Sequence, residues 1–196
     1  MFSLLRAHIE KRVHLTDEEF NITAKYFVPK TIKKHQFLLN EGIVCKHIGF
    51  VNSGCLREYT IDSKGIEHIA QFAIKDWWVS DLHSFLSGLP ATNNIDALQD
   101  SEVLLLEKSA REELLDNCPK MERFFRLLIE ANQIATRERI TESLGASAEE
   151  RYLKFIKTYP KLFELVPQNQ IASYLGITPV SLSRIRTRIK KQINNC

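Results

Sequence analysis

The chain has 196 residues, of which 44% are hydrophobic and 26% charged, a composition typical of globular proteins. This length allows two small domains or one large one, and no stretch approaches the roughly 20 apolar residues that a membrane span needs. The amphipathic N-terminus lacks the apolar core of a signal peptide, so we expect a cytoplasmic protein. The four cysteines lack CxxC spacing, which argues against a metal or iron-sulfur site and favours reduced thiols.

The net charge of +3 conceals an asymmetry along the chain. Residues 151–196 carry nine lysines and arginines against one acid, whereas residues 1–150 carry 18 basic and 23 acidic side chains. A basic C-terminal segment suits binding to nucleic-acid phosphates, because neutralised phosphates release counterions. Charge alone leaves a second interpretation open, in which this segment is a solvated basic surface.

Helix signals open the chain and strand signals follow. Residues 3–14 are amphipathic, and Thr16 with Glu19 predicts a capping box for a second helix that ends near Tyr26. From Pro29 to Glu107, apolar runs alternate with turn residues about 8 to 12 residues apart, which is typical of an antiparallel sandwich or barrel. We expect strands within residues 37–42, 47–54, 55–62, 67–74, 76–81 and 94–107.

A long helix is predicted over residues 120–144, after a short helix that Ser109 and Glu112 would cap. Apolar residues cover more than half of its circumference, so one side can pack on the barrel and another on a second copy. A helix buried wholly in its own subunit is the alternative. The predicted homodimer interface consists of Phe124, Leu127, Leu128, Ala131, Ile134 and Ala135.

Gly145 ends the long helix and suits a hinge, and Ser147 with Glu150 predicts the capping box of the next helix. The expected domains are therefore a sensor domain at 1–118, a dimerisation helix with its hinge at 119–145, and a DNA-binding domain at 146–196.

Residues 168–185 have the pattern of a helix-turn-helix. Five apolar positions, the small Ala172 and Gly176 at the turn fit two short crossing helices. Thr178 supplies a capping hydroxyl and Pro179 a first helical residue, so the second helix should begin there. The alternative is a small helical hairpin that closes a core.

The order of these elements resembles the Crp/Fnr family of bacterial transcription regulators over nearly the whole chain. The runs NSGCLREY, VSDLHSFLSGLPATNNIDALQDSEVLLLE and QIASYLGITPVSLSRIR are similar to its β-roll turns, phosphate-binding cassette and reading head. The resemblance implies an α+β fold: an N-terminal antiparallel β-roll of the cyclic-nucleotide-binding type (a double-stranded β-helix) with flanking helices, a long dimerisation helix and a C-terminal winged helix-turn-helix. It also implies a homodimeric regulator that is no enzyme, binds a pseudo-palindromic operator in double-stranded DNA and acts with RNA polymerase.

In this family an arginine and a following hydroxyl residue hold the phosphate of the cyclic nucleotide, and a carboxylate holds the ribose. An ungapped comparison puts the carboxylate at Asp81, the arginine at Ala91 and the hydroxyl at Thr92. Because the cation is missing, we expect a degenerate pocket that disfavours cyclic AMP and takes another small-molecule effector or none. The candidate effector-pocket residues are Ser80, Asp81, Leu82, Ala91, Thr92, Asn93, Thr136 and Arg137.

In the reading head, Pro179 and Val180 stand where the family often has an arginine and a glutamate, so the operator should differ. Arg184 suits a guanine and Val180 a thymine methyl group. The predicted DNA-binding residues are Gln168, Gln170, Thr178, Val180, Ser181, Arg184, Arg186 and Arg188. The alternative function is a ligand-binding or metal-dependent barrel protein whose basic tail mediates protein contacts. No catalytic or metal motif is present in the sequence.

Overall fold

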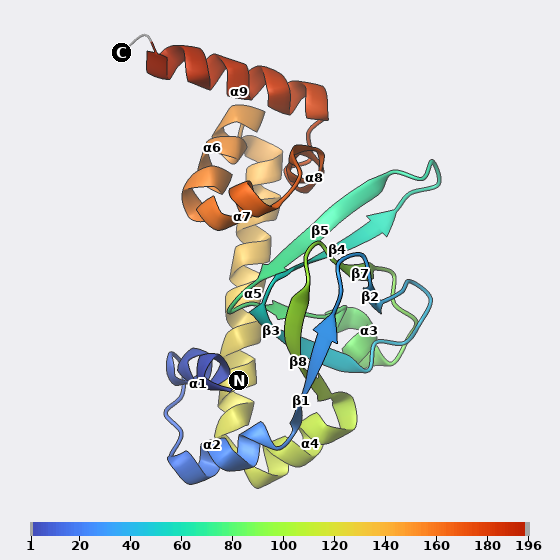
Figure 1. Ribbon diagram of the computed structural model, residues 1–196, viewed down its shortest axis with the longest axis vertical. Coiled ribbons are helices and arrows are strands. Elements are labelled where there is room, and N and C mark those ends of the chain that lie inside the picture. Colours follow the sequence, from blue (N-terminus) through green and yellow to red (C-terminus); the bar gives the residue numbers. More distant parts are fainter. Residues whose placement is uncertain (1, 195–196) are drawn as a thin grey trace. The chain divides into compact units, whose positions relative to one another are not determined.

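The computed structural model describes residues 2–194 and divides the chain into two compact units (Figure 1). The first unit comprises residues 1–60 and 71–132, and the second comprises residues 61–70 and 133–196. The strands are β1 (Phe27–Ile32), β2 (Phe37–Leu39), β3 (His47–Ser53), β4 (Cys55–Ile61), β5 (Glu67–Ile74), β6 (Trp78–Val79), β7 (Asn94–Ala97) and β8 (Ser101–Glu107). The helices are α1 (Ser3–Glu10), α2 (Asp17–Ala24), α3 (Leu82–Ser87), α4 (Lys108–Asn117), α5 (Lys120–Gly145), α6 (Ala148–Thr158), α7 (Pro160–Leu165), α8 (Gln168–Tyr174) and α9 (Pro179–Asn194).

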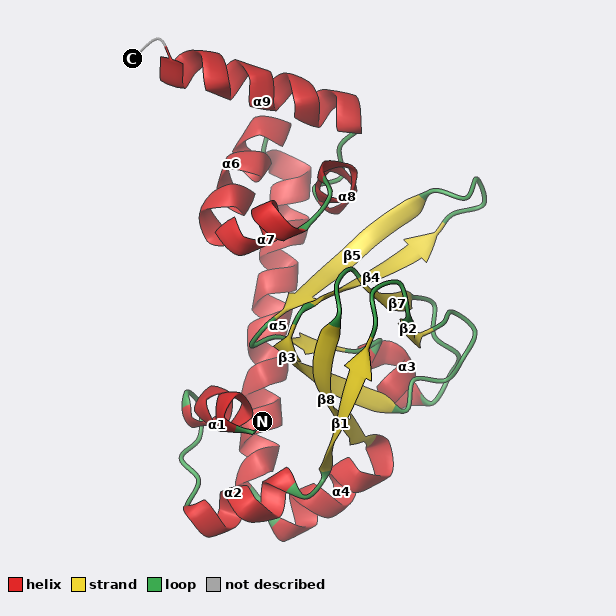
Figure 2. Cartoon of the chain, viewed as in Figure 1, coloured by secondary structure: helices red, strands yellow, loops and turns green. Residues whose placement is uncertain are grey.

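The strands form two four-stranded sheets, ordered β1-β8-β3-β6 and β2-β7-β4-β5, which are coloured yellow in Figure 2. Every strand expected from the sequence is present, and the predicted α+β fold with an antiparallel β-roll is confirmed. Two details differ: β1 was not expected, and residues 94–107 form two strands rather than one.

Close packing at a turn explains the second difference. Gly54 has a φ of +92° and joins β3 to β4, and its Cα faces the corner between β7 and β8. A Cβ at this position would lie 2.6 Å from both the carbonyl oxygen of Asp100 and the Cα of Ser101. Because β7 and β8 belong to different sheets, the chain must turn between them, and the glycine lets the β3–β4 turn lie against that second turn.

The core of the first unit lies between the sheets and the helices α1, α2, α4 and the first turns of α5. Fully buried members include Leu5, Ile9, Phe50 and Leu106, which come from α1, β3 and β8. The predicted Thr16–Glu19 capping box is confirmed, with both of its hydrogen bonds present. No helix in the described residues is long and apolar enough to cross a membrane.

Three local predictions are wrong. Helix α1 ends at Glu10 rather than near residue 14, because the chain must become extended before the N-cap at Thr16. The capping box predicted at Ser109 is absent: α4 already begins at Lys108, whose amide donates to the carbonyl oxygen of Lys46, so the barrel backbone satisfies this amide. The described chain contains no strand after Glu107, so the wing implied by the family resemblance is not formed there.

The second unit is built from helices, apart from the tip of the β4–β5 hairpin. The Ser147–Glu150 capping box begins α6 as predicted, and a short helix, α7, follows it. Tyr152 and Phe155 of α6 are buried with Leu162 of α7. Together they form the base on which α8 and α9 pack.

Candidate functional site

The turn between α8 and α9 has the geometry that the helix-turn-helix pattern predicts. Gly176 has a φ of +66°, its amide donates to the carbonyl oxygen of Ser173, and the amide of Ile177 donates to that of Ala172. These two bonds are those of a Schellman motif, in which a left-handed residue ends a helix. Ala172 is fully buried, as expected where two helices cross closely.

Helix α9 begins at Pro179, as predicted, with Thr178 as its cap. The Thr178 hydroxyl oxygen accepts a hydrogen bond of 3.1 Å from the amide of Ser181, and the two hydroxyls lie 2.9 Å apart. Leu182 and Ile185 are buried and fix which side of α9 packs on its own unit. The opposite side of the helix is therefore the side available to a partner.

Helical geometry places five exposed residues on that opposite side. They are Val180, Ser183, Arg184, Thr187 and Lys191, and we call this set the α9 outer face. The sequence interpretation included Val180 and Arg184 but missed Ser183 and Thr187. The signal was available, because positions about half a turn away from Leu182 and Ile185 must point outwards.

The three arginines of α9 have different surroundings. The guanidinium of half-buried Arg186 lies 5.6 Å over the ring of Phe163. Burial raises the pKa of Tyr152, and the positive charge of Arg186 partly offsets that rise. Arg188 forms an ion pair of 2.7 Å with Glu149 at the start of α6. Among the side chains described, up to Lys191, no partner is found for the Arg184 guanidinium, so of the three arginines it is the one open to a ligand.

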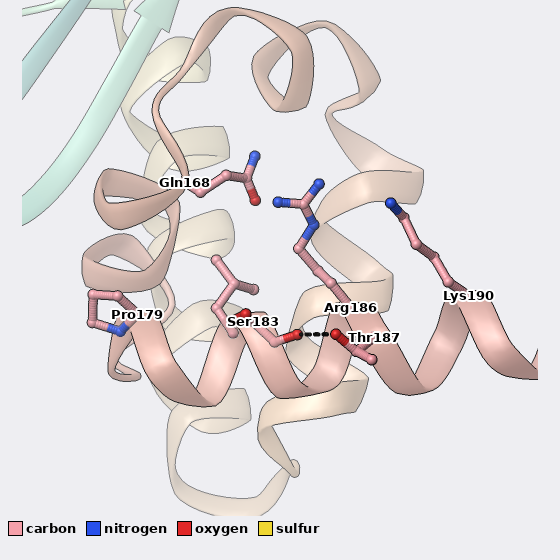
Figure 3. Close-up of a pocket in the computed structure, with 7 residues that line it drawn as sticks. Gln168, Pro179, Ser183, Arg186, Thr187 and Lys190 are labelled. Carbon is pink, nitrogen blue, oxygen red and sulfur yellow. Dashed lines mark hydrogen bonds between the residues drawn. The ribbon is translucent and has the colours of Figure 1, made fainter.

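Gln168 and Gln170 lie at the start of α8, beside α9. A cavity of about 360 Å³ lies along α9, and its lining residues are Gln168 of α8 and Pro179, Leu182, Ser183, Arg186, Thr187 and Lys190 of α9. Figure 3 shows Gln168 and Arg186 pointing into it from opposite sides. The side-chain oxygens of Gln168 and Gln170 are buried, and no hydrogen-bond partner is found for them among the described residues.

The tip of the β4–β5 hairpin is held in the second unit by two side chains, Ser173 and Arg139. The Ser173 hydroxyl donates to the carbonyl oxygen of Glu67 at 2.9 Å and accepts from the amide of Ile69 at 3.0 Å. Arg139 of α5 donates to the carbonyl oxygen of Ala70 at 2.5 Å, and its guanidinium lies 5.0 Å over the ring of Tyr174. Helix α8 and a segment distant in sequence are thus joined.

In the first unit, the predicted ribose carboxylate has another role. Asp81 is only 2% exposed and caps α3, where it accepts hydrogen bonds from the amide of Ser84 at 2.9 Å. It also accepts from the amide of Thr92 and the side-chain amide of Asn93, both at 3.2 Å. These three donors would be needed to bind the phosphate of a cyclic nucleotide, but here they are already bound to the carboxylate of Asp81.

Ala91 is buried, and its backbone pairs with the preceding loop: its amide donates to the carbonyl oxygen of Ile43, and its own carbonyl accepts from Gly42. The cation that is buried in this barrel is Arg57, which holds both carboxylate oxygens of Asp96 at 2.8 and 3.0 Å. The sequence analysis did not predict this pair, because nothing local relates residues 39 positions apart.

The other effector-pocket candidates are scattered. The Ser80 hydroxyl donates to the carbonyl oxygen of His47 at 3.1 Å, and Leu82 is exposed. Thr136 is half-buried and Arg137 exposed, and both belong to the second unit. Their assignment to one pocket with Asp81 stays a prediction.

Trp78 packs in an aromatic cluster rather than standing open to a planar ligand. Its ring lies 5.3 Å from that of Phe50, 5.9 Å from Phe124 and 6.1 Å from His8. The indole also donates to Nε2 of His8, which is the nitrogen that Arg12 approaches at 3.1 Å. Since Nε2 faces two donors, the ring proton must lie on Nδ1, which contacts Asp76 at 2.8 Å.

The predicted dimer residues fall into three groups by exposure. Phe124 is fully buried in its own unit, so it is corrected from an interface residue to a core residue, because no surface of it is left for a second copy. Leu127 and Leu128 are half-buried beside the core. Ala131, Ile134 and Ala135 are exposed, with Ile134 at 62%.

Cys45, Cys55 and Cys118 are free and buried, and burial raises the pKa of the Cys55 thiol to about 12. Cys196 lies outside the described residues. Within residues 2–194, no three His, Cys, Asp or Glu side chains come together as a metal site would need.

Comparisons with known proteins agree with this architecture. Residues 29–118 match the cyclic nucleotide-binding domain family. The fumarate and nitrate reduction regulatory protein of Yersinia pestis is 27% identical over 191 residues, which cover 91% of this chain and 74% of that protein. Electron transport regulator A of Shewanella oneidensis is 27% identical over 176 residues, which cover 83% of this chain and 68% of that protein.

Solved structures show the same fold. The c-di-GMP responsive global regulator CLP of Xanthomonas campestris aligns with a TM-score of 0.73 at 9% identity over 90% of this chain and 93% of that one. The catabolite activator protein of Thermus thermophilus aligns with a TM-score of 0.57 at 18% identity over 91% of this chain and 85% of that one. The chain thus contains a domain of the cyclic nucleotide-binding type and is similar, over most of its length, to regulatory proteins such as that of Yersinia pestis.

Proposed function

We propose that this chain binds a specific pseudo-palindromic operator in double-stranded DNA as a homodimer and regulates transcription. The relatives with which the chain aligns are regulators by name. The observation that carries the proposal is the α9 outer face, where Arg184 stands without a described partner among small side chains, on the second helix of a helix-turn-helix. A guanidinium held open in this way can donate two hydrogen bonds to a guanine edge. We further propose that the protein acts in the cytoplasm and contacts RNA polymerase when it is bound to this operator.

The proposed dimer contact is an apolar seam of α5 that runs from half-buried Leu127 to exposed Ile134. Leu127, Ala131 and Ile134 are separated by four and three residues, which is the spacing of a coiled-coil seam. Ile134 at 62% exposure has a large apolar surface to bury. A two-fold axis along this seam would present two copies of α9 to two half-sites, which is why the operator should be a pseudo-palindrome.

The effector pocket is proposed to be degenerate. Ala91 stands where a phosphate would need a guanidinium, and losing one partner of a buried charged pair costs roughly 3 to 5 kcal/mol, or more than about two decades in affinity. Asp81 adds a second obstacle, because its carboxylate already occupies the amides of Ser84 and Thr92 and would repel a phosphate. We therefore expect calorimetry to find no submicromolar affinity for cyclic AMP or cyclic GMP.

The direct test is a mobility shift with duplexes selected from a random pool, repeated over a range of salt concentrations. A DNA-binding regulator should select a pseudo-palindrome, and log K should fall linearly with log salt in proportion to the phosphates contacted. Arg184→Ala should lower the affinity for the selected site far more than that for random duplex. If no sequence is enriched and the salt slope is flat, the proposal fails and the basic segment serves protein contacts instead.

A further inference from the structure

The α9 outer face contains two methyl-bearing side chains that are two helical turns apart. Val180 is 61% exposed near the start of the helix, and Thr187 is exposed seven residues later. Ser183 and Arg184 lie between them on the same face. The four positions are thus separated by three, one and three residues, and this same spacing separates the four base-reading positions on the recognition helix of a homeodomain.

The hydroxyl of Thr187 is already engaged. Its Oγ1 donates a hydrogen bond of 3.0 Å to the carbonyl oxygen of Ser183 one turn earlier, the bond drawn as a dashed line in Figure 3. Because the hydroxyl donates to its own helix, the methyl group is the part of the Thr187 side chain that is free to contact a partner. Thr187 therefore resembles Val180 in chemistry, although it is classed as polar.

We infer that α9 reads two thymine methyl groups in the major groove, one through Val180 and one through Thr187, with the Arg184 guanidinium directed at a guanine between them. The inference rests on the proposed DNA-binding function and adds the base class that the helix selects. The C5 methyl of thymine is the apolar group that a major groove presents to such side chains.

The distance between the two readers sets the distance between the thymines. Seven residues of α-helix rise about 10 Å, which equals about three steps of B-form DNA. The half-site should therefore have two thymines about three base pairs apart, on one strand or on opposite strands. Two of the three arginines do not compete for this surface, because Arg186 lies over Phe163 and Arg188 is paired with Glu149.

The test uses the full chain and its own selected duplex, in which each candidate thymine is replaced by uracil. Uracil keeps every hydrogen-bonding group of thymine and lacks only the methyl. Removing one buried methyl-sized group should weaken binding about fourfold. We expect this loss at two positions about three base pairs apart, and at no other thymine of the half-site.

Matched variants assign each methyl to its reader. Val180→Ala should abolish sensitivity to uracil at one position only, and Thr187→Ser, which keeps the hydroxyl and its backbone bond, should abolish it at the other. Thr187→Val keeps a methyl without the hydroxyl and should stay sensitive. Lys191→Gln should weaken all duplexes alike. All three positions are exposed, and unfolding curves would show that each of the four variants is folded.

The outcomes separate this inference from the function on which it rests. A selected operator that tolerates uracil at every position would overturn the inference and leave specific DNA binding intact. Sensitivity to uracil that the Val180 and Thr187 variants retain would also overturn it, because other side chains would then read the methyl groups. Selection of no sequence would overturn the proposed function and the inference together.

Discussion

The phosphate-binding cassette of the first unit and the α9 outer face of the second differ in how their polar groups are used. In the cassette, Asp81 takes up three donors of its own chain, and deeper in the barrel Arg57 holds Asp96. On the α9 outer face, the Arg184 guanidinium has no partner within the described residues, and Ser183 is exposed. The family resemblance predicts a ligand at the cassette and at the α9 outer face. Of the two, only the α9 outer face has polar groups that are not already hydrogen-bonded within the described residues, so only this surface can bind a ligand strongly.

The largest effect should come from breaking the buried ion pair of the barrel. Asp96→Ala removes the bidentate partner of a buried guanidinium, which should lower the free energy of unfolding by about 3 to 5 kcal/mol. Urea denaturation followed by circular dichroism measures this loss. The matched control is the double replacement Arg57→Met with Asp96→Leu, which removes both charges and should recover most of the stability. An unchanged midpoint for Asp96→Ala would mean that the pair is open to solvent.

A smaller loss should follow when the cassette is opened. Asp81→Ala leaves the amides of Ser84 and Thr92 without their acceptor, and we expect the free energy of unfolding to fall by about 2 to 3 kcal/mol. Asp81→Asn keeps a capping oxygen and should lose less than half of that amount. Equal losses in the two variants would show that the negative charge, rather than the cap, stabilises the loop.

On the α9 outer face the effect should appear in binding rather than stability. Arg184→Ala should reduce discrimination between the selected and a random duplex by about 1 to 3 kcal/mol. Arg186→Ala should leave that discrimination nearly unchanged, because its side chain lies over Phe163. Lys190→Ala should mainly reduce the salt slope by about 1. Competition titrations at several salt concentrations measure all three, and equal losses on every sequence would place the reading face elsewhere.

The smallest effect should be a dependence of the first unit on pH. Burial lowers the pKa of His8 below its ordinary 6.5, against the opposing influence of Asp76. The unfolded chain therefore binds the proton more tightly, so stability should be full above pH 6.5 and decline as the pH falls from there towards the lowered pKa. His8→Gln should remove this decline between pH 7 and 5. The α9 outer face contains no histidine. The preference for the selected duplex should therefore not decline with pH as the stability of the first unit does.

Patterns read over a few residues predicted the local structure well. The capping boxes at Thr16 and Ser147, the turn at Gly176 and the start of α9 at Pro179 each depend on residues within four positions of one another. Predictions from local sequence failed where a residue distant in sequence supplies the hydrogen bond. Ser109 does not cap α4, because the carbonyl oxygen of Lys46 already takes the first amide of that helix.

The candidate site shows the same limit. Local pattern located the helix-turn-helix, and the family resemblance singled out Arg184 for base contact and left Arg186 and Arg188 to contact phosphates, but neither could show what engages those two side chains within the chain. The rings and carboxylates that engage those two arginines, Phe163 and Glu149, lie more than 20 residues away in sequence. In the cassette, the missing arginine at Ala91 was visible in the sequence, whereas the three hydrogen bonds that occupy Asp81 were not.

The bonds between Ser173 and the hairpin tip have a consequence for how this protein can evolve. The unit that contains α8 and α9 includes residues 61–70, which are encoded in the middle of the barrel sequence. A recombination that exchanged everything after residue 132 would replace Ser173 and Arg139 while leaving the backbone of Glu67, Ile69 and Ala70 behind. An exchanged segment must therefore bring its own donors at positions 139 and 173 to keep these bonds. The hairpin contributes only backbone groups, so its side chains are free to change without loss of this junction.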